Sequence, residues 1–126
     1  MKTVENLKKA FAGESQASRK YLAFAVKAME EGKPEIAQLF LEAAGAESAH
    51  AVNHLKVLGE IGTTEENLKK AAEGENYEIE EMYPEFIRQA EEEGMKDAAE
   101  SFRIAMEREK KHREMFRKAL ESLGAD

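Results

Sequence analysis

Seven side chains that can bind a metal ion fall at regular spacings along the sequence. Glu47 and His50 form one Glu-x-x-His pair, and Glu109 and His112 form a second. Residues three positions apart lie on the same face of a helix, so each pair can direct two ligands at one point. Carboxylate oxygen and imidazole nitrogen suit iron or manganese, whereas a zinc site is usually smaller and four-coordinate. The two pairs therefore predict a site for iron or manganese.

Three further carboxylates, Glu14, Glu75 and Glu78, share the helical phase of these pairs. Glu from two helices combined with Glu-x-x-His from two others is the arrangement of di-iron and di-manganese carboxylate proteins. The set carries five negative charges, which two divalent or two trivalent ions bring close to neutrality. A solvated charged face paired with Lys and Arg would explain any one pair, but not all seven residues in phase near mid-helix. We expect two iron ions, oxo- or hydroxo-bridged when oxidised, with manganese or a mixed manganese–iron pair as the alternatives.

The residues around each predicted ligand follow the spacing of a buried helix face. In the last quarter of the chain, steps of three and four residues connect Ala98, Phe102, Ala105, Glu109, His112, Phe116, Ala119 and Leu123. Such steps mark the face that a helix packs against its neighbours. A carboxylate buried there without a partner costs several kcal/mol or shifts its pKa until it is neutral. A bound cation would supply the missing partner.

Glycine-containing breaks at residues 30–35, 59–66 and 92–97 divide the chain into four helices, at about 4–30, 35–58, 64–93 and 95–122. Thr63 or Thr64, followed by two Glu residues, is typical of a helix N-cap. Pro84 lies inside the third helix, where we expect a kink. The abundance of Ala, Glu, Lys, Leu and Met also favours helix. The fold class is therefore all-α, a ferritin-like four-helix bundle with a buried di-metal site.

Length and composition exclude several classes of protein. The 126 residues suit a single domain, 1–126, and carry a net charge of −7 with no dense Lys/Arg block. Nucleic acid and anionic lipid are therefore not the expected partners. The chain has no cysteine, so any metal must be held by oxygen and nitrogen. With no long apolar stretch, we expect no membrane span and a cytoplasmic location.

The connection between the second and third helices limits how the bundle forms. In a ferritin-type bundle these helices run parallel, so the link from the level of His50 to that of Glu75 must descend roughly 28 Å. Five or six extended residues reach only about 20 Å. We therefore expect a homodimer in which two chains exchange helical hairpins. If residues 64–73 were extended rather than helical, a single chain could close the bundle.

Three other side chains fall close to the predicted ligands. Tyr21 lies seven residues after Glu14 and Tyr83 follows Glu78, so each can hydrogen-bond a ligand carboxylate or simply pack in the core. His54 lies seven residues after Glu47, but no Glu precedes it by three. We expect His54 to lie near the metals or to be partly exposed, rather than to bind them.

Four segments of the sequence resemble the metal-binding motifs of the rubrerythrin family, in the same order and over essentially the whole chain. They read FAGESQA with the following Tyr21, AESAHA, GENYEIEEMYP and EREKKH. The resemblance implies a ferritin-like domain in which iron is bound by Glu14, Glu47, Glu75, Glu78, Glu109 and His112. It also implies that His50 is a further or redox-dependent ligand, with one iron moving between Glu78 and His50 as its oxidation state changes.

The resemblance further implies a peroxidase that reduces hydrogen peroxide to water in defence against oxidative stress. Rubrerythrins normally carry a Cys-rich, rubredoxin-like domain that relays electrons, and no such domain is found in these cysteine-free 126 residues. A separate rubredoxin or a reductase is then the expected donor. Three alternatives remain open: an iron-handling ferroxidase, an oxidase that activates dioxygen, and a metal-free interaction bundle.

Overall fold

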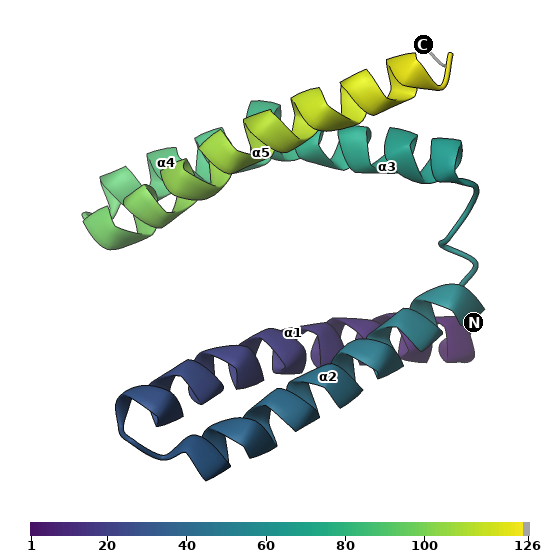
Figure 1. Ribbon diagram of the computed structural model, residues 1–126. Coiled ribbons are helices and arrows are strands. Elements are labelled where there is room, and N and C mark those ends of the chain that lie inside the picture. The colour runs from purple at the N-terminus through teal and green to yellow at the C-terminus, as the bar shows by residue number, and fades with distance from the viewer. Residues whose placement is uncertain (125–126) are drawn as a thin grey trace. The chain divides into compact units, whose positions relative to one another are not determined.

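The computed structural model describes residues 1–124, which are all-α as the sequence predicts and contain no β-strand. The elements, in chain order, are α1 (Lys2–Glu30), α2 (Pro34–Val57), α3 (Thr64–Tyr77), the π-helical turn η1 (Glu78–Met82), α4 (Tyr83–Glu92) and α5 (Lys96–Ser122) (Figure 1). No described helix has the length and apolarity needed to cross a membrane.

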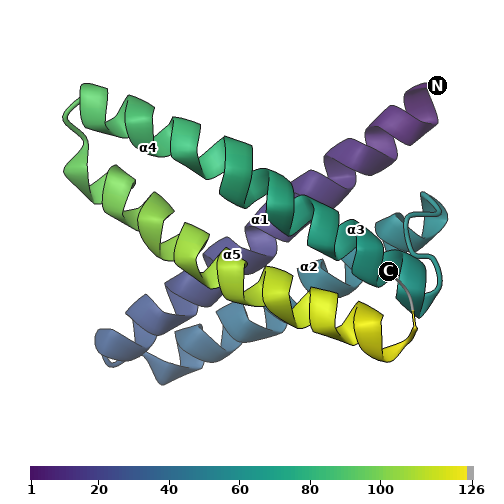
Figure 2. The same ribbon diagram turned by 90° about the horizontal axis from the view of Figure 1, so that it is seen from above.

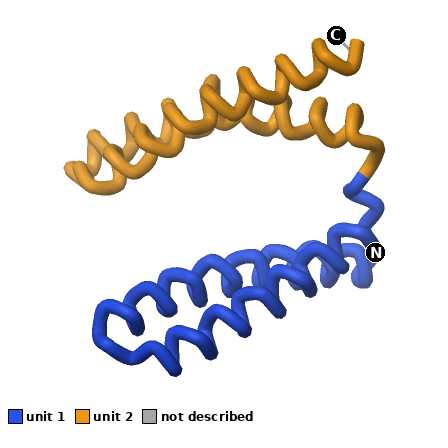
Figure 3. The backbone as a smooth tube through the Cα atoms, in the orientation of Figure 1, with its two compact units in different colours: residues 1–61 blue, residues 62–126 orange. Residues whose placement is uncertain are grey.

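The helices are organised as two compact units, one formed by Met1–Ile61 and the other beginning at Gly62 (Figure 3). In the first unit, α1 and α2 pack side by side as an antiparallel hairpin, here called hairpin 1 (Figure 2). In the second unit, α3, η1 and α4 form one long interrupted helix that packs against α5, and this pair is called hairpin 2. Hairpin 1 carries three of the seven predicted ligands and hairpin 2 carries four, and the single domain over 1–126 remains a prediction.

Small side chains bring the two helices of hairpin 1 together. Ala25, Ala28 and Ala37 form its buried core, against which Phe40 packs. Ser18 is buried on the same face, and its Oγ donates a hydrogen bond to the carbonyl oxygen of Ala44 at 3.2 Å. Because these side chains are short, the two backbones approach closely, and polar groups on α1 and α2 can meet.

Hairpin 2 is built in a similar way, with one long polar connection added. Ile79, Ala90 and Ala99 are its buried apolar residues. Arg113 of α5 reaches across to the other helix, where its Nη1 donates to Asn76 Oδ1 at 2.9 Å and to Glu80 Oε1 at 3.0 Å. Arg113 therefore connects α5 to both α3 and the π-helical turn.

A capping box begins α3. Thr63 Oγ1 accepts a hydrogen bond from the backbone N–H of Glu66 at 3.2 Å, and Glu66 Oε1 accepts one from the N–H of Thr63 at 2.8 Å. These bonds with Thr63 lower the pKa of Glu66. Thr63 is thus the cap, and the chain is helical from Thr64 through Tyr77. Residues 64–73 are not extended, which removes the condition under which a single chain could close the bundle.

The irregularity in the third predicted helix precedes Pro84. Over Glu78–Met82 the helix widens to a π-helical turn, and the N–H of Tyr83 donates to the carbonyl oxygen of Glu78, five residues earlier. Pro84 follows within the first turn of α4. It lacks an N–H group, so the backbone must re-form its hydrogen-bond pattern at this point. Sequence reasoning predicted a kink here and missed the extra residue in the turn.

Candidate metal centre

Hairpin 1 brings Glu14 of α1 together with Glu47 and His50 of α2. His50 Nδ1 lies 3.2 Å from Glu14 Oε1 and 3.8 Å from Glu47 Oε1. One ligand atom from each of the three residues lies within 4.8 Å of the others. Two ligand atoms that each lie about 2.0–2.2 Å from one metal ion can be at most about 4.4 Å apart, which is close to the separations in this cluster. These three side chains therefore form a half-site that can hold one ion.

Hairpin 2 repeats this cluster with Glu75 of α3 and Glu109 and His112 of α5. His112 Nδ1 lies 3.5 Å from Glu109 Oε1 and 3.9 Å from Glu75 Oε1. One ligand atom from each again lies within 4.8 Å of the others. In both hairpins the histidine turns Nδ1 toward the carboxylates, so the pattern Glu plus Glu-x-x-His occurs twice with the same chemistry.

Two carboxylate oxygens show that these clusters suit a cation. Glu14 Oε2 and Glu75 Oε2 are buried, and neither has a hydrogen-bond partner in the described part of the chain. A buried anionic oxygen without a donor is costly, because it has lost its water and gained no compensating charge. A metal ion bound by the same carboxylate, through either of its oxygens, would compensate that charge. The side chains present therefore fit the two ions that the sequence predicts.

Glu78 is the first residue of the π-helical turn, and it joins the cluster of hairpin 2. A hydrogen bond between the side chains of Glu78 and Glu109, followed by burial and by the charge of Glu109, raises the pKa of Glu78 to about 7. Two carboxylates in such contact favour one shared proton. Hairpin 2 thus presents three carboxylates and one imidazole, whereas the cluster of hairpin 1 has two carboxylates and one imidazole.

Tyr83 lies beside the same carboxylates. Burial raises its pKa, with smaller contributions from the charges of Glu78, Glu109 and Glu75. Its phenol therefore remains protonated at neutral pH and is available as a hydrogen-bond donor. Tyr21 of hairpin 1 packs among aromatic rings, with its ring centroid 6.1 Å from that of Phe40 and 6.3 Å from that of Phe24.

The two hairpins are internal repeats, a feature that sequence reasoning missed. Hairpin 2 contains the aromatic cluster Tyr83, Phe86 and Phe102, with centroid separations of 5.4 to 6.3 Å. Each ring stands 62 residues after its counterpart in the cluster Tyr21, Phe24 and Phe40, and the same offset relates Glu47 to Glu109 and His50 to His112. Comparison of the sequence with itself at this offset would have revealed the repeat.

The repeat also explains the π-helical turn. Glu75 follows Glu14 by 61 residues rather than 62, so hairpin 2 has one additional residue between this ligand and its tyrosine. The additional residue lies where η1 widens the helix. A π-helical turn accommodates one extra residue without changing the phase of the helix beyond it. Tyr83 and Phe86 consequently keep their places, and Glu78 is added to the site.

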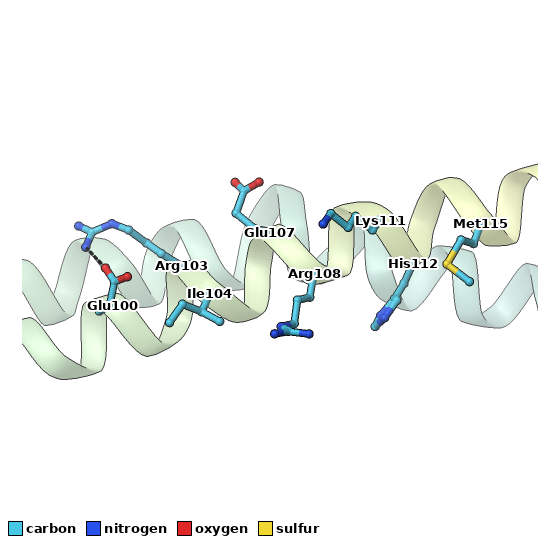
Figure 4. A pocket seen from close by; sticks show the side chains of 8 residues that line it. All are labelled: Glu100, Arg103, Ile104, Glu107, Arg108, Lys111, His112 and Met115. Atoms are coloured by element: carbon cyan, nitrogen blue, oxygen red, sulfur yellow. Dashed lines mark ion pairs between the residues drawn. The ribbon is translucent and has the colours of Figure 1, made fainter.

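Two histidines have neighbours in addition to the contacts described above. His54, one turn after His50 on α2, places Nε2 2.5 Å from Glu14 Oε2. His112 lies on an open face of α5, along a surface hollow of about 510 Å³ whose lining includes Ile104, Arg108 and Met115 (Figure 4). Because α5 alone supplies the whole lining, the hollow is an open helix face and not a substrate pocket.

The fold and the clusters define a class, the ferritin-like di-metal carboxylate proteins. Comparison with known proteins narrows it, since the sequence model of the rubrerythrin family matches residues 5–120. The chain belongs to the rubrerythrin family. It is 39% identical to Rubrerythrin-1 of Clostridium acetobutylicum, with 97% of this chain and 71% of that protein covered. It is also 39% identical to nigerythrin of Nitratidesulfovibrio vulgaris, with 98% of this chain and 68% of that protein covered.

A solved structure agrees with this assignment. The fully reduced, all-ferrous state of nigerythrin matches with a TM-score of 0.50 at 38% identity, over 98% of this chain and 68% of that one. The ferritin-like fold predicted from the sequence is thereby confirmed. Family membership also supports a di-iron oxidoreductase role of the peroxidase type.

Proposed function

We propose that this protein is a non-haem di-iron peroxidase that reduces hydrogen peroxide to water with electrons from an external donor. The observation that carries the proposal is the pair of equivalent clusters, Glu14, Glu47 and His50 in one hairpin and Glu75, Glu109 and His112 in the other, each within 4.8 Å. The membership of this chain in the rubrerythrin family supports the same reaction. Iron is the metal we propose, with manganese or a mixed pair as the alternatives.

Each residue of the site has a simple part in this reaction. Seven side chains would hold the two ions: Glu14, Glu47, Glu75, Glu78, Glu109, His50 and His112. Among them, Glu78 and His50 are the ligands proposed to exchange as the oxidation state of the iron changes. When bound there, two ferrous ions would supply the two electrons that, with two protons, convert hydrogen peroxide to two water molecules. Tyr83 lies near enough to Glu78, Glu109 and Glu75 for their charges to raise its pKa, and we propose that its protonated phenol orients these carboxylates by hydrogen bonding.

Stopped-flow absorbance tests the reaction. Reduced protein loaded with two irons per site is mixed separately with hydrogen peroxide and with dioxygen. A peroxidase forms the diferric state quickly with peroxide and slowly with oxygen, and an added donor such as rubredoxin or a reductase returns it to the diferrous state. The opposite preference would instead favour a ferroxidase or an oxygen-activating oxidase.

A matched pair of variants on α5 sharpens this test. E109Q removes a proposed ligand, whereas E107Q changes an exposed glutamate that pairs with Lys110 at 3.0 Å. E109Q should lose iron and the reaction with peroxide, and E107Q should keep both. Equal activity of the two variants would contradict the assignment of Glu109.

We further propose that two chains exchange hairpins, so that hairpin 1 of one chain completes a site with hairpin 2 of its partner. In the ferritin-type arrangement His50 of α2 and Glu75 of α3 lie at the same level of parallel helices. The connection must therefore run back along the end of α2 and the beginning of α3. His50 lies seven residues before Val57 and Glu75 eleven after Thr64, a descent of roughly 27 Å. The six residues 58–63 span at most about 20 Å. Light scattering should give the mass of two chains.

A complementation experiment distinguishes exchange from simple dimerisation. E47A inactivates hairpin 1 and E109A inactivates hairpin 2, so neither variant alone has a complete site. When equal amounts are unfolded and refolded together, exchange gives mixed dimers in which the two intact hairpins meet. About a quarter of the wild-type number of sites should then bind metal and react with peroxide. Without exchange the mixture stays inactive.

We propose a cytoplasmic location for this dimer.

A further inference from the structure

The internal repeat is broken at one position that lies against a metal ligand. His54 of hairpin 1 corresponds, at the 62-residue offset, to Phe116 of hairpin 2. The neighbouring equivalents are unchanged in type, since Glu47 matches Glu109 and His50 matches His112. The two half-sites therefore share two carboxylates and one imidazole. Hairpin 2 adds Glu78, and hairpin 1 has His54 one turn further along the helix.

His54 makes its contact with Glu14. His54 Nε2 lies 2.5 Å from Glu14 Oε2, and His50 Nδ1 lies 3.2 Å from Glu14 Oε1. The two histidines are four residues apart on α2, so they face the same carboxylate, one at each oxygen. His54 Nε2 is therefore within hydrogen-bond distance of Oε2, although the contact does not have the geometry of a hydrogen bond.

The corresponding oxygen of hairpin 2 has no such neighbour. Glu75 Oε2 is buried without a hydrogen-bond partner in the described residues, and Phe116 has no nitrogen to offer. Both side chains of the His54–Glu14 contact are mostly shielded from solvent, with 29% and 25% of their surfaces exposed. An imidazole held this close to a shielded carboxylate restricts its rotation and its choice of oxygen.

We propose that His54 is a positioning residue that occupies Oε2 of Glu14 and leaves Oε1 to the metal. Glu14 then binds through one oxygen, while Glu75, which has no equivalent of His54, keeps both oxygens for its ion. The half-site of hairpin 1 is thereby ordered in advance and takes up the first of two metal ions. This inference rests on the di-metal site of the proposed function, but it does not depend on the reaction with peroxide.

Cobalt(II) titration of the metal-free protein tests the inference without turnover. The visible absorbance of bound cobalt reports both affinity and ligand set. Wild-type protein should bind two ions in two steps, the tighter one at hairpin 1. H54F, which copies hairpin 2, should weaken that tighter step about 10- to 100-fold, the usual effect of removing a residue that orients a ligand. H54Q, whose amide N–H can still donate to Glu14, should restore most of the affinity with an unchanged cobalt spectrum.

The control is F116L, which changes the equivalent position of hairpin 2 and should leave the tighter step unchanged. Circular dichroism checks that each variant is folded. Equal affinities of H54F and wild type would overturn the inference. So would an H54Q protein with an altered cobalt spectrum and no recovered affinity, because His54 would then be a ligand. Wild-type protein that binds cobalt in these two steps but fails to reduce peroxide would contradict only the proposed function.

Discussion

The carboxyl groups of Glu78 and Glu109 share a hydrogen bond across hairpin 2, and this bond is the largest cause of a pKa of about 7 at Glu78. Burial and the charge of Glu109 act in the same direction. Around neutral pH the metal-free cluster therefore holds a proton between two carboxylates. A metal ion that binds both must displace that proton, which couples metal binding to pH.

The stability of the metal-free protein should consequently depend on Glu78. Its pKa is raised in the folded state from an ordinary value of 4.5 to about 7. A group whose pKa is raised by folding contributes its full stabilisation at pH values below its pKa in the unfolded state. That stabilisation is lost as the pH rises through its pKa in the folded state. Urea unfolding should show the wild type losing stability between about pH 5 and pH 8, relative to E78Q. The amide that E78Q introduces stays neutral throughout this range and can still donate to Glu109.

Comparison with E78Q isolates the contribution of Glu78, because every other side chain is the same in both proteins. If the two proteins had parallel pH profiles, the proton would not be held at Glu78. A wild type that gains stability relative to E78Q as the pH rises would show that the pKa is lowered, contrary to the structure.

Removal of metal should destabilise the protein. Without ions, each cluster keeps one buried carboxylate oxygen that accepts no hydrogen bond in the described residues. A metal ion that binds only the folded state raises the free energy of unfolding by about 2.7 kcal/mol when its concentration is 100 times its Kd. Thermal unfolding followed by circular dichroism should show a higher Tm with ferrous or manganous ion than with chelator. An unchanged Tm would favour the metal-free interaction bundle.

The candidate ligands could be found in the sequence because helical periodicity alone places them on shared faces. Glu47 with His50, and Glu109 with His112, share a helix face whatever lies opposite. The pairing of α1 with α2 follows from the short turn between them. Both kinds of inference use only distances along the chain, and the structure contains the two helices and the two clusters that they imply.

The π-helical turn and the contact of His54 were not predictable in this way. Counting at 3.6 residues per turn from Thr64 assigns one regular helix through Glu93, and a widened turn breaks that count without a residue type to mark it. The approach of His54 to Glu14 depends on how closely the backbones of α1 and α2 pack. That distance is set by small side chains such as Ala25 and Ala37, whose effect appears only in three dimensions.

The close approach of α1 and α2 can be tested at Ala37, which is 1% exposed. A37L should destabilise the protein by about 1–3 kcal/mol, because the larger side chain has no space between the helices. It should also weaken metal binding at hairpin 1 by moving Glu14 away from α2. The control is A23L on the exposed side of α1, which should change neither property. Urea unfolding and cobalt titration provide the two measurements, and equal behaviour of both variants would contradict the close packing.

Arg113 should hold the π-helical turn in place. Its side chain is 18% exposed and donates to Asn76 of α3 and to Glu80 of η1. Hydrogen bonds to charged groups contribute about 1.5–3 kcal/mol, and solvent screening at the exposed Glu80 reduces this to about 1–2 kcal/mol for R113A. Urea unfolding of the metal-free protein measures the loss. The control is K110A, whose exposed pair with Glu107 should contribute less than about 0.5 kcal/mol.

R113A should also weaken metal binding at hairpin 2, because Glu78 stands at the start of the turn that Arg113 holds. Cobalt titration should show a weaker second step and an unchanged first step, since hairpin 1 is untouched. R113K keeps the positive charge but cannot reproduce the planar guanidinium group. Its stability should fall between those of wild type and R113A. If R113A matched K110A in stability and wild type in metal affinity, the turn would be maintained by the backbone alone, through the hydrogen bond from Tyr83 to Glu78.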